Sequence, residues 1–440
     1  MILIEKFHKV EIENNFFHLG KEINLPIWDI VRNDVYFKYY YPEHERKRFE
    51  QIQKHSILDY FFLLKEAFLF IFKLFFQKGE IIVFSASRYI DADGQYFDKS
   101  AQAVIDCYEK SAIIIEPILR KNTKNQYVYD FSNVLRKFRK ISILNQQDYD
   151  NLNVALTKEF GECLITLKDL NLILSNFTSD VRFYRWYFKL NKIKTIFICT
   201  GNPKAQIQAA KSLGIKTYLM QHASIEQDSA EYSYPLEINI NSRVLFSDVV
   251  LTYSDFWCKT INVPTKEIIS IGNDYFLNPI NATFDGSILV ISTIIHGDIL
   301  KALTMDYAKK HKDVKIIYKL HPNEFSFFNN YKSYFKDCAN VSVISDEVDT
   351  SVLIEKCKIV VLIVSTVLYE ALNKNKKVAV LKLLNYERQL HLNNLNNIYF
   401  FDNISELDTI IKKPTLNKSI DFYKKTDTEL IKKLFLYKNK

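Results

Sequence analysis

The sequence predicts an α/β protein with two Rossmann-like, doubly wound domains and a final C-terminal helix. Short apolar, β-branched runs alternate with helical segments along most of the chain, which indicates parallel strands covered by helices on both faces. The 440 residues also exceed the length of one ordinary domain. A loop-rich stretch at 272–286 interrupts the alternation, which then restarts. We therefore expect domains at 1–275 and 286–410, with the ends of their strands facing a shared cleft.

The first domain is predicted from six apolar runs and the helices between them. We expect helices at 99–110 and 203–213, the second ended by Gly214 as a C-cap, and a mostly helical insertion over 131–190. The expected strands cover 80–85, 112–116, 194–199, 216–220, 249–252 and 267–271.

The second domain repeats this pattern with shorter spacings. Helices are expected at 298–310, 349–356 and 366–372. The expected strands cover 288–292, 314–320, 341–344, 359–364 and 377–381. Polar residues follow several of these strands directly, at the edge where parallel sheets bind ligands.

Two segments bear on membrane association. The run 57–76 is very apolar, but its charged residues make a buried or interfacial helix the better interpretation than a membrane span. The tail, 411–440, carries much of the net charge of +8 and predicts a basic amphipathic helix. That helix either packs on the fold or lies on a membrane surface.

Composition excludes several classes of protein. The six cysteines are scattered without a CxxC pair, which argues against a zinc site or a disulfide framework and for a reducing compartment. No nucleic-acid motif accompanies the positive charge. The N-terminus lacks the apolar core of a signal peptide. We expect a cytoplasmic protein, with peripheral association at the inner face of the membrane as a further expectation.

The segment YKLHPNE follows the predicted strand 314–320 and offers the first candidate ligand contacts. Lys319 supplies a cation and His321 a switchable imidazole, while Pro322 ends the strand and Glu324 follows it. The alternative is a strand ended by proline, with His321 satisfied by hydrogen bonds inside the fold.

The segment STVLYEAL follows the predicted strand 359–364 and offers the second set. Ser365 and Thr366 suit a helix N-cap, and the N–H groups of a first helical turn favour a phosphate. Glu370 lies one turn further on, where it could accept hydrogen bonds from a ribose. The alternatives are an ordinary N-cap and a solvated glutamate. Together the two segments predict a nucleotide-binding edge.

These two motifs carry a resemblance to a known group of proteins. KLHPNE followed by STVLYEAL resembles bacterial GT-B enzymes that build capsules and lipopolysaccharide, including sialyl-, polysialyl- and Kdo-transferases. In those enzymes the HP and Ser/Thr motifs hold the CMP part of the donor. The resemblance is extended by GIKTYLMQHASIEQDSAEYSYP, TYSDFWCK and SASRYIDADGQYFD. It implies a GT-B-like fold with an acceptor domain first and a nucleotide-sugar-binding domain second.

The resemblance implies an activity as well. It predicts a glycosyltransferase that uses a nucleotide-activated sugar, with a CMP donor favoured, and a glycan or glycolipid acceptor. Neither a metal nor a separate cofactor is expected. The chain departs from the pattern at Ala223, where glycine usually follows Gln-His, and at Ala92, which separates Asp91 from Asp93. Those departures leave the identity of the base and a sialyl donor open.

The base has three candidates. Asp93 is the first choice, because it precedes Gly94 in a loop after a first-domain strand. Asp91 is its neighbour, and His222 ends another strand. Arg88 could bind an acidic acceptor sugar or a phosphate. The alternatives are an Asp-Gly surface turn, a buried histidine and a surface charge.

Other functions remain open alongside sugar transfer. The chain has no GxGxxG, GxxxxGK[ST] or GxSxG motif and no HExxH-type metal spacing. A CDP-polyol phosphotransferase of the teichoic-acid type would share the fold and would use His222 as base. A non-catalytic nucleotide- or sugar-binding subunit of a capsule assembly complex is a third possibility. A nucleotide-sugar 2-epimerase also shares the two-domain fold.

Overall fold

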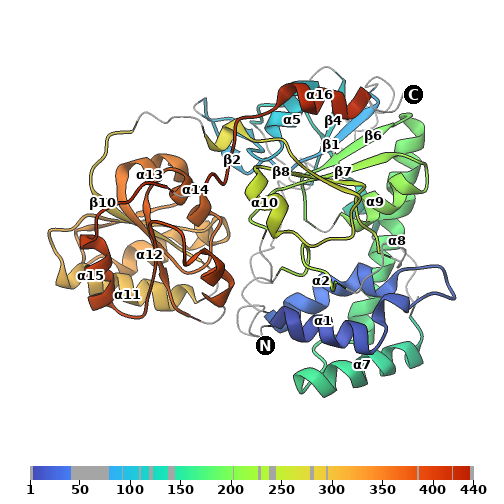
Figure 1. Ribbon diagram of the computed structural model, residues 1–440, viewed down its shortest axis with the longest axis horizontal. Coiled ribbons are helices and arrows are strands. Elements are labelled where there is room, and N and C mark those ends of the chain that lie inside the picture. The colour runs from blue at the N-terminus through green and yellow to red at the C-terminus, as the bar shows by residue number, and fades with distance from the viewer. Residues whose placement is uncertain are drawn as a thin grey trace. The chain divides into compact units, whose positions relative to one another are not determined.

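A computed structural model describes most of the chain and divides it into two compact units (Figure 1). The first unit contains the described residues up to Tyr275 and those from Lys425 onward, and the second those from Phe276 to Lys424. The predicted α/β class is confirmed in both units. The described residues are 3–40, 79–91, 93–108, 111–117, 122–136, 144–201, 203–225, 229–236, 244–277, 282–293, 296–383, 386–418 and 420–436.

The first unit is built on a parallel seven-stranded sheet with the order β5-β4-β1-β6-β7-β8-β9. All six predicted strands are present and end within two residues of their expected limits. They are β1 (Ile81–Phe84), β4 (Ala112–Glu116), β6 (Thr195–Ile198), β7 (Lys216–Met220), β8 (Val249–Thr252) and β9 (Glu267–Ser270). The short β5 (Val128–Tyr129) was not predicted, nor was the antiparallel hairpin of β2 (Tyr89–Ile90) and β3 (Tyr96–Phe97).

Helices cover both faces of this sheet (Figure 1). On one face, α5 (Gln102–Tyr108) and the C-terminal α16 (Thr428–Leu436) share a core with the strands. On the other, α8 (Leu167–Leu190) packs Tyr184 and Phe188 against Phe84 of β1, beside α9 (Lys204–Lys211). Further described helices are α6 (Ser132–Leu135), α10 (Asp255–Thr260) and, at the boundary of the unit, η3 (Asp274–Phe276).

An N-terminal helical layer is fixed to this core by buried ion pairs. It comprises α1 (Leu3–Glu13), η1 (Phe16–His18), α2 (Ile27–Tyr40) and α7 (Gln146–Phe160). Nζ of Lys204 lies 2.9 Å from both carboxylate oxygens of Asp29 and 2.8 Å from the hydroxyl of Tyr234. Nε of Arg32 lies 2.5 Å from Oε1 of Glu11. Removing one partner would leave a buried charge uncompensated. The Lys204–Asp29 pair therefore holds α2 against α9, and the Arg32–Glu11 pair holds α2 against α1.

The second unit contains a six-stranded parallel sheet with the order β12-β11-β10-β13-β14-β15. The five predicted strands are β10 (Ser287–Ile291), β11 (Ile316–Lys319), β12 (Val341–Ile344), β13 (Cys357–Leu362) and β14 (Lys377–Leu381). The sixth strand, β15 (Ile398–Phe401), was not predicted. The central strands are buried on both faces, as their continuous β-branched runs require.

Helices again cover both faces of the sheet (Figure 1). The first face carries α11 (Gly297–Lys310), α12 (Phe328–Tyr334) and α15 (Ile404–Lys412), which contribute to one buried core. The second carries α13 (Thr350–Lys356) and α14 (Val367–Asn373). Two 3₁₀ segments, η4 (Pro322–Phe327) and η5 (Tyr386–Leu392), follow β11 and β14.

The C-terminal segment differs from the single helix predicted over 411–440. The described residues 413–418 and 420–427 are not helical, because Pro414 cannot continue α15, and α16 begins only at Thr428. Ile431 is fully buried in the core of the first unit, and the carbonyl oxygens of Ile431 and Leu434 accept hydrogen bonds from Tyr108 and Tyr218. The described helix of this tail, α16, therefore packs on the first unit.

The predicted helix at 57–76 lies outside the described residues. Within the part of the chain that the structure describes, no helix has both the length and the apolar character needed to cross a membrane.

Candidate functional site

The second unit has a topological switch point at the carboxyl end of β10. The chain runs from β10 outward through β11 to β12 and then returns to the other side of β10 as β13. In open α/β sheets, ligands bind where the strand order reverses in this way. The HPNE segment follows β11 and the STVLYEAL segment follows β13. The fold therefore brings the two predicted motifs to the same sheet edge, on either side of β10.

His321 begins the 3₁₀ segment η4 and makes local hydrogen bonds. Its Nδ1 accepts a hydrogen bond from the backbone N–H of Asn323 at 3.2 Å, and its backbone N–H donates to Oε2 of Glu324 at 3.4 Å. With Nδ1 as acceptor, the neutral ring carries its proton on Nε2. A ring in this state can donate one hydrogen bond to a phosphate oxygen. Pro322 occupies the first position of η4, where its missing N–H costs nothing.

Glu324 is fully buried and bonded inside the fold. Its carboxylate accepts hydrogen bonds from the hydroxyl of Ser292 at 2.5 Å, from the hydroxyl of Tyr331 and from the backbone N–H of His321. Because Ser292 directly follows β10, Glu324 connects the loops after β10 and β11. Its position is that of a residue that orients His321.

Lys319 is also buried, with 7% of its surface exposed. Its ammonium donates a hydrogen bond to the backbone carbonyl of Ser345, in the loop after β12. Burial lowers the pKa of Lys319, and the carboxylates of Glu347 and Asp349 oppose that shift. The structure thus directs this cation toward the acidic loop after β12.

The STVLYEAL segment forms the expected helix start. Oγ of Ser365 accepts a hydrogen bond from the backbone N–H of Val367 at 3.2 Å, whereas the side chain of Thr366 makes no capping bond. Both residues are half-buried. Glu370, expected at the ligand surface, is 6% exposed on the buried face of α14.

In the first unit, the predicted base Asp93 lies at the tip of the β2–β3 hairpin and is exposed. Asp91 holds the turn, because its Oδ1 accepts hydrogen bonds from the backbone N–H groups of Asp93 at 3.1 Å and Gln95 at 2.8 Å. Gly94 has a φ of 75°, the left-handed conformation expected for it. Arg88 is exposed at the start of the hairpin.

The loop between β1 and the hairpin is held by two buried carboxylates that the sequence predictions missed. Glu116, the last residue of β4, accepts hydrogen bonds from the hydroxyls of Ser85 at 3.1 Å and Ser87 at 2.5 Å. Asp98 accepts from the backbone N–H groups of Ala86 and Ser100, each at 2.9 Å. Burial raises the pKa of both carboxyls. An acid at the end of a predicted strand was the signal available for Glu116.

His222 follows β7 at the carboxyl edge of the first sheet. Its Nδ1 lies 3.3 Å from the hydroxyl of Tyr232. The loop after β6 lies close to this ring, because a Cβ atom added to Gly201 would be 4.0 Å from Nε2 of His222. The preceding Gln221 is buried and accepts a hydrogen bond from the backbone N–H of Tyr253 at 3.0 Å. In the Gln-His pair, Gln221 therefore fixes the loop after β8, and His222 supplies a half-buried imidazole.

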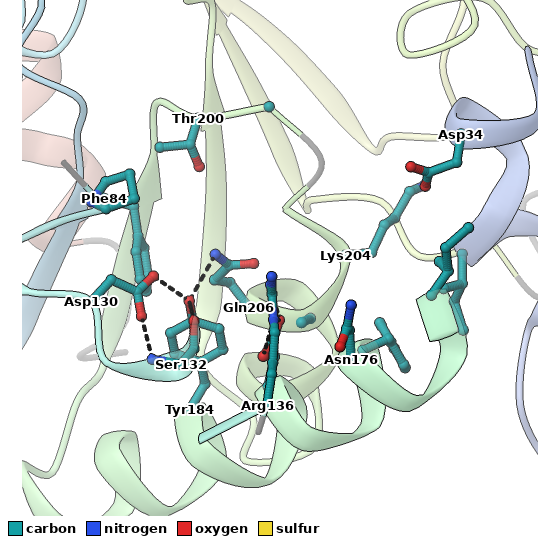
Figure 2. Close-up of a pocket in the computed structure, with 17 residues that line it drawn as sticks. Asp34, Phe84, Asp130, Ser132, Arg136, Asn176, Tyr184, Thr200, Lys204 and Gln206 are labelled. Atoms are coloured by element: carbon teal, nitrogen blue, oxygen red, sulfur yellow. Dashed lines mark hydrogen bonds and ion pairs between the residues drawn. The ribbon is translucent and has the colours of Figure 1, made fainter. Parts of the chain in front are cut away.

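A pocket of about 320 Å³ lies in the first unit at its own switch point, where β1 is followed on one side by β4 and on the other by β6 (Figure 2). This volume is at the lower end of the range for small-molecule sites. In Figure 2, Asp130 and Ser132 lie on one side of the pocket and Asp34 and Lys204 on the other. None of the predicted site residues lines it.

The two cations that the structure describes in the lining of this pocket are engaged within the protein. The ammonium of Lys204 is bound to Asp29, as described above, and lies 2.9 Å from the carbonyl oxygen of Leu245. Nε of Arg136 lies 2.9 and 3.1 Å from the two carboxylate oxygens of Asp180. Asp130 accepts hydrogen bonds from the hydroxyl of Tyr184 at 2.6 Å and from the backbone N–H of Ser132 at 3.0 Å.

The fold and the two switch-point edges define a two-domain α/β protein of the GT-B type. The structure of UDP-GlcNAc 2-epimerase from Methanocaldococcus jannaschii, in complex with UDP-GlcNAc and UDP, is 12% identical to this chain. The match covers 81% of this chain and 99% of that one, with a TM-score of 0.51. For UDP-GlcNAc 2-epimerase from Neisseria meningitidis the identity is 13%, the coverages 81% and 98%, and the TM-score 0.48. At such identities the likeness concerns the fold.

More particularly, residues 272–388 match a family model described as "Capsule polysaccharide biosynthesis protein". The matched segment covers much of the second unit and contains both strand-end motifs. No curated protein sequence matches the chain.

Proposed function

We propose that the protein is a glycosyltransferase that transfers a sugar from a nucleotide-activated donor to a capsule or other surface polysaccharide, or to a lipooligosaccharide. The observation that carries this proposal is the convergence of the HPNE and STVLYEAL motifs on one switch point. Both motifs lie within the segment that matches the capsule biosynthesis model. A switch-point edge that holds a hydrogen-bonding imidazole and a helix start suits a nucleotide phosphate.

Each predicted residue has a role in this proposal. His321, Ser365 and Thr366 contact the nucleotide, and Glu324 orients His321. Lys319, Pro322 and Glu370 shape the edge around them. In the first unit, Asp93 is the first choice for the base that deprotonates the acceptor hydroxyl, with His222 as the rival. Asp91 sets the turn that carries Asp93, and Arg88 is the candidate contact for an acidic group. CMP is the favoured nucleotide, which would make the donor a sialic acid or Kdo.

Thermal-shift binding of CMP, CDP, UDP and GDP tests the nucleotide site directly. A nucleotide that binds the native protein raises the melting temperature by mass action, and the His321→Ala variant should lose that rise. His311→Ala is the matched control. His311 lies at the C-terminal end of α11, outside both motifs, and it pairs with Asp408. A response to CMP alone supports the favoured donor, and a response to UDP or GDP changes the donor class. No response to any of the four would contradict the proposal.

The second candidate is nucleotide-sugar 2-epimerisation, which the fold shared with a UDP-GlcNAc 2-epimerase supports. Incubation with UDP-GlcNAc without any acceptor separates the two functions. Formation of the 2-epimer would replace the transferase proposal. Turnover of CDP-glycerol or CDP-ribitol would instead indicate polyol phosphate transfer, and nucleotide binding without any turnover a non-catalytic subunit.

A further inference from the structure

The pocket of the first unit is lined by both polar and apolar groups. Its polar groups include Asp130 and Asp34, together with the amides of Asn176 and Gln206. Phe84, Phe177, Ile30 and Ile173 contribute apolar walls. Pockets of this kind bind ligands that have both an apolar face and several hydroxyl groups, because each hydroxyl can donate to a carboxylate and accept from an amide.

One buried atom of the pocket has no partner within the described residues. Oδ1 of Asn176, on α8, is buried without any hydrogen bond. A buried acceptor without a bond is costly, and a donor from a bound ligand would relieve that cost. On the facing helix α9, Nε2 of Gln206 donates a long hydrogen bond of 3.3 Å to the hydroxyl of Tyr184. The two amides therefore offer one open acceptor and one weakly used donor.

The charged groups of the described lining do not favour an anionic ligand. Among the described residues, the cations of its lining are Arg136 and Lys204, and both are bound to carboxylates of the protein. Asp34 and Asp130 add two further carboxyl groups to the described lining. Desolvation of a phosphate or of a sugar carboxylate beside these groups would not be compensated.

We propose that this pocket is a binding subsite for one uncharged sugar residue. Identification of that residue as part of the acceptor glycan depends on the proposed transferase function, whereas the binding of a neutral sugar does not. The subsite would select a neutral acceptor end and exclude the donor nucleotide from this pocket.

Ligand-observed NMR on the full-length protein tests the proposal without donor or turnover. The probes are methyl glycosides of neutral hexoses and N-acetylhexosamines, compared with methyl glycosides of uronic acids. At least one neutral glycoside should bind the wild type and the uronic acids should not. Asn176→Leu and Gln206→Leu should each weaken that binding by about tenfold. Gln208→Leu is the matched control, because Gln208 lies on the same helix but does not line the pocket.

Three results would overturn the proposal. They are the absence of binding by every neutral glycoside at tens of millimolar, equal binding by the wild type and Asn176→Leu, and stronger binding by the uronic acids. Thermal shift by nucleotides is recorded on the same variants and should not change. If the wild type binds a neutral glycoside but none of the four nucleotides, the transferase function is rejected and the sugar subsite is retained.

Discussion

The hydroxyl of Ser292 donates a hydrogen bond of 2.5 Å to the buried carboxylate of Glu324, which joins the loop after β10 to the HPNE segment. The same carboxylate accepts the backbone N–H of His321. Glu324 therefore fixes the loop from which His321 reaches the switch point. The motif suggested Glu324 as a ligand contact, but its carboxylate is bonded to Ser292, Tyr331 and His321 inside the fold.

The Glu324→Gln variant tests this role. It replaces an acceptor-only group by one that also donates, so we expect a loss of about 1–3 kcal/mol in the free energy of unfolding. Nucleotide binding should weaken as well, because His321 loses its support. Urea denaturation and thermal shift measure the two effects.

Ser292→Ala and the double variant complete a thermodynamic cycle with Glu324→Gln. If the two side chains are coupled, the double variant should lose less stability than the sum of the single variants. An additive result would show that the contact has no energetic role.

The sequence predicted the fold better than it predicted side-chain roles. A strand such as β13 is buried on both faces, and its run of β-branched residues identifies it without tertiary information. The strands β2, β3 and β5 have two residues each, too few for a periodic signal. The two strand-end motifs could also be located from the sequence, because each begins where polar residues end a long apolar run.

The direction of a side chain depends on partners that are distant in sequence. Lys319 turns to the carbonyl of Ser345 and Glu324 to Ser292, and neither partner belongs to its motif. The pocket of the first unit was missed for a related reason. Its residues come from β1, from α2, α6, α8 and α9, and from the loops after β4, β5 and β6, and they share no spacing that marks a site.

The C-terminal helix should stabilise the first unit rather than bind a membrane. Ile431 is fully buried, so Ile431→Ala should lower the free energy of unfolding by about 2–4 kcal/mol. Lys432→Ala is the control, because Lys432 is exposed on the same helix and should change stability little. Loss of vesicle binding by Ile431→Ala, at unchanged stability, would instead support the membrane-surface alternative.

Two asparagines on α8 should respond in opposite ways to the same substitution. Asn176→Leu removes a buried acceptor without a partner and should raise the free energy of unfolding by about 1 kcal/mol. Asn171→Leu removes the acceptor for the backbone N–H of Leu144, a bond of 2.9 Å, and should lower it by about 1–3 kcal/mol. Equal effects of both substitutions in urea denaturation would show that Asn176 is satisfied in solution.

The carboxyl group of Asp34 should make stability depend on pH. Burial raises its pKa above the ordinary value of 3.8. The native state therefore binds more protons than the unfolded state just above that value, and stability falls as the pH rises through the raised pKa. Asp34→Asn removes this penalty, so it should melt higher than the wild type at neutral pH and equally at pH below 3.8. A constant difference at all pH values would exclude ionisation as the cause.

The hairpin tip should separate the role of Asp93 from that of Asp91. Asp91→Ala removes two hydrogen bonds to the turn, so amide exchange at Gln95 should become faster. Asp93 is exposed, so Asp93→Ala should leave hairpin exchange unchanged. If Asp93 is the base, this variant and Asp93→Asn should both lower kcat for sugar transfer by about 10²–10⁴. The KM for the donor should change little. Full activity of both Asp93 variants, with loss of activity in His222→Ala, would transfer the role of base to His222, which is held beside Tyr232 at the end of β7.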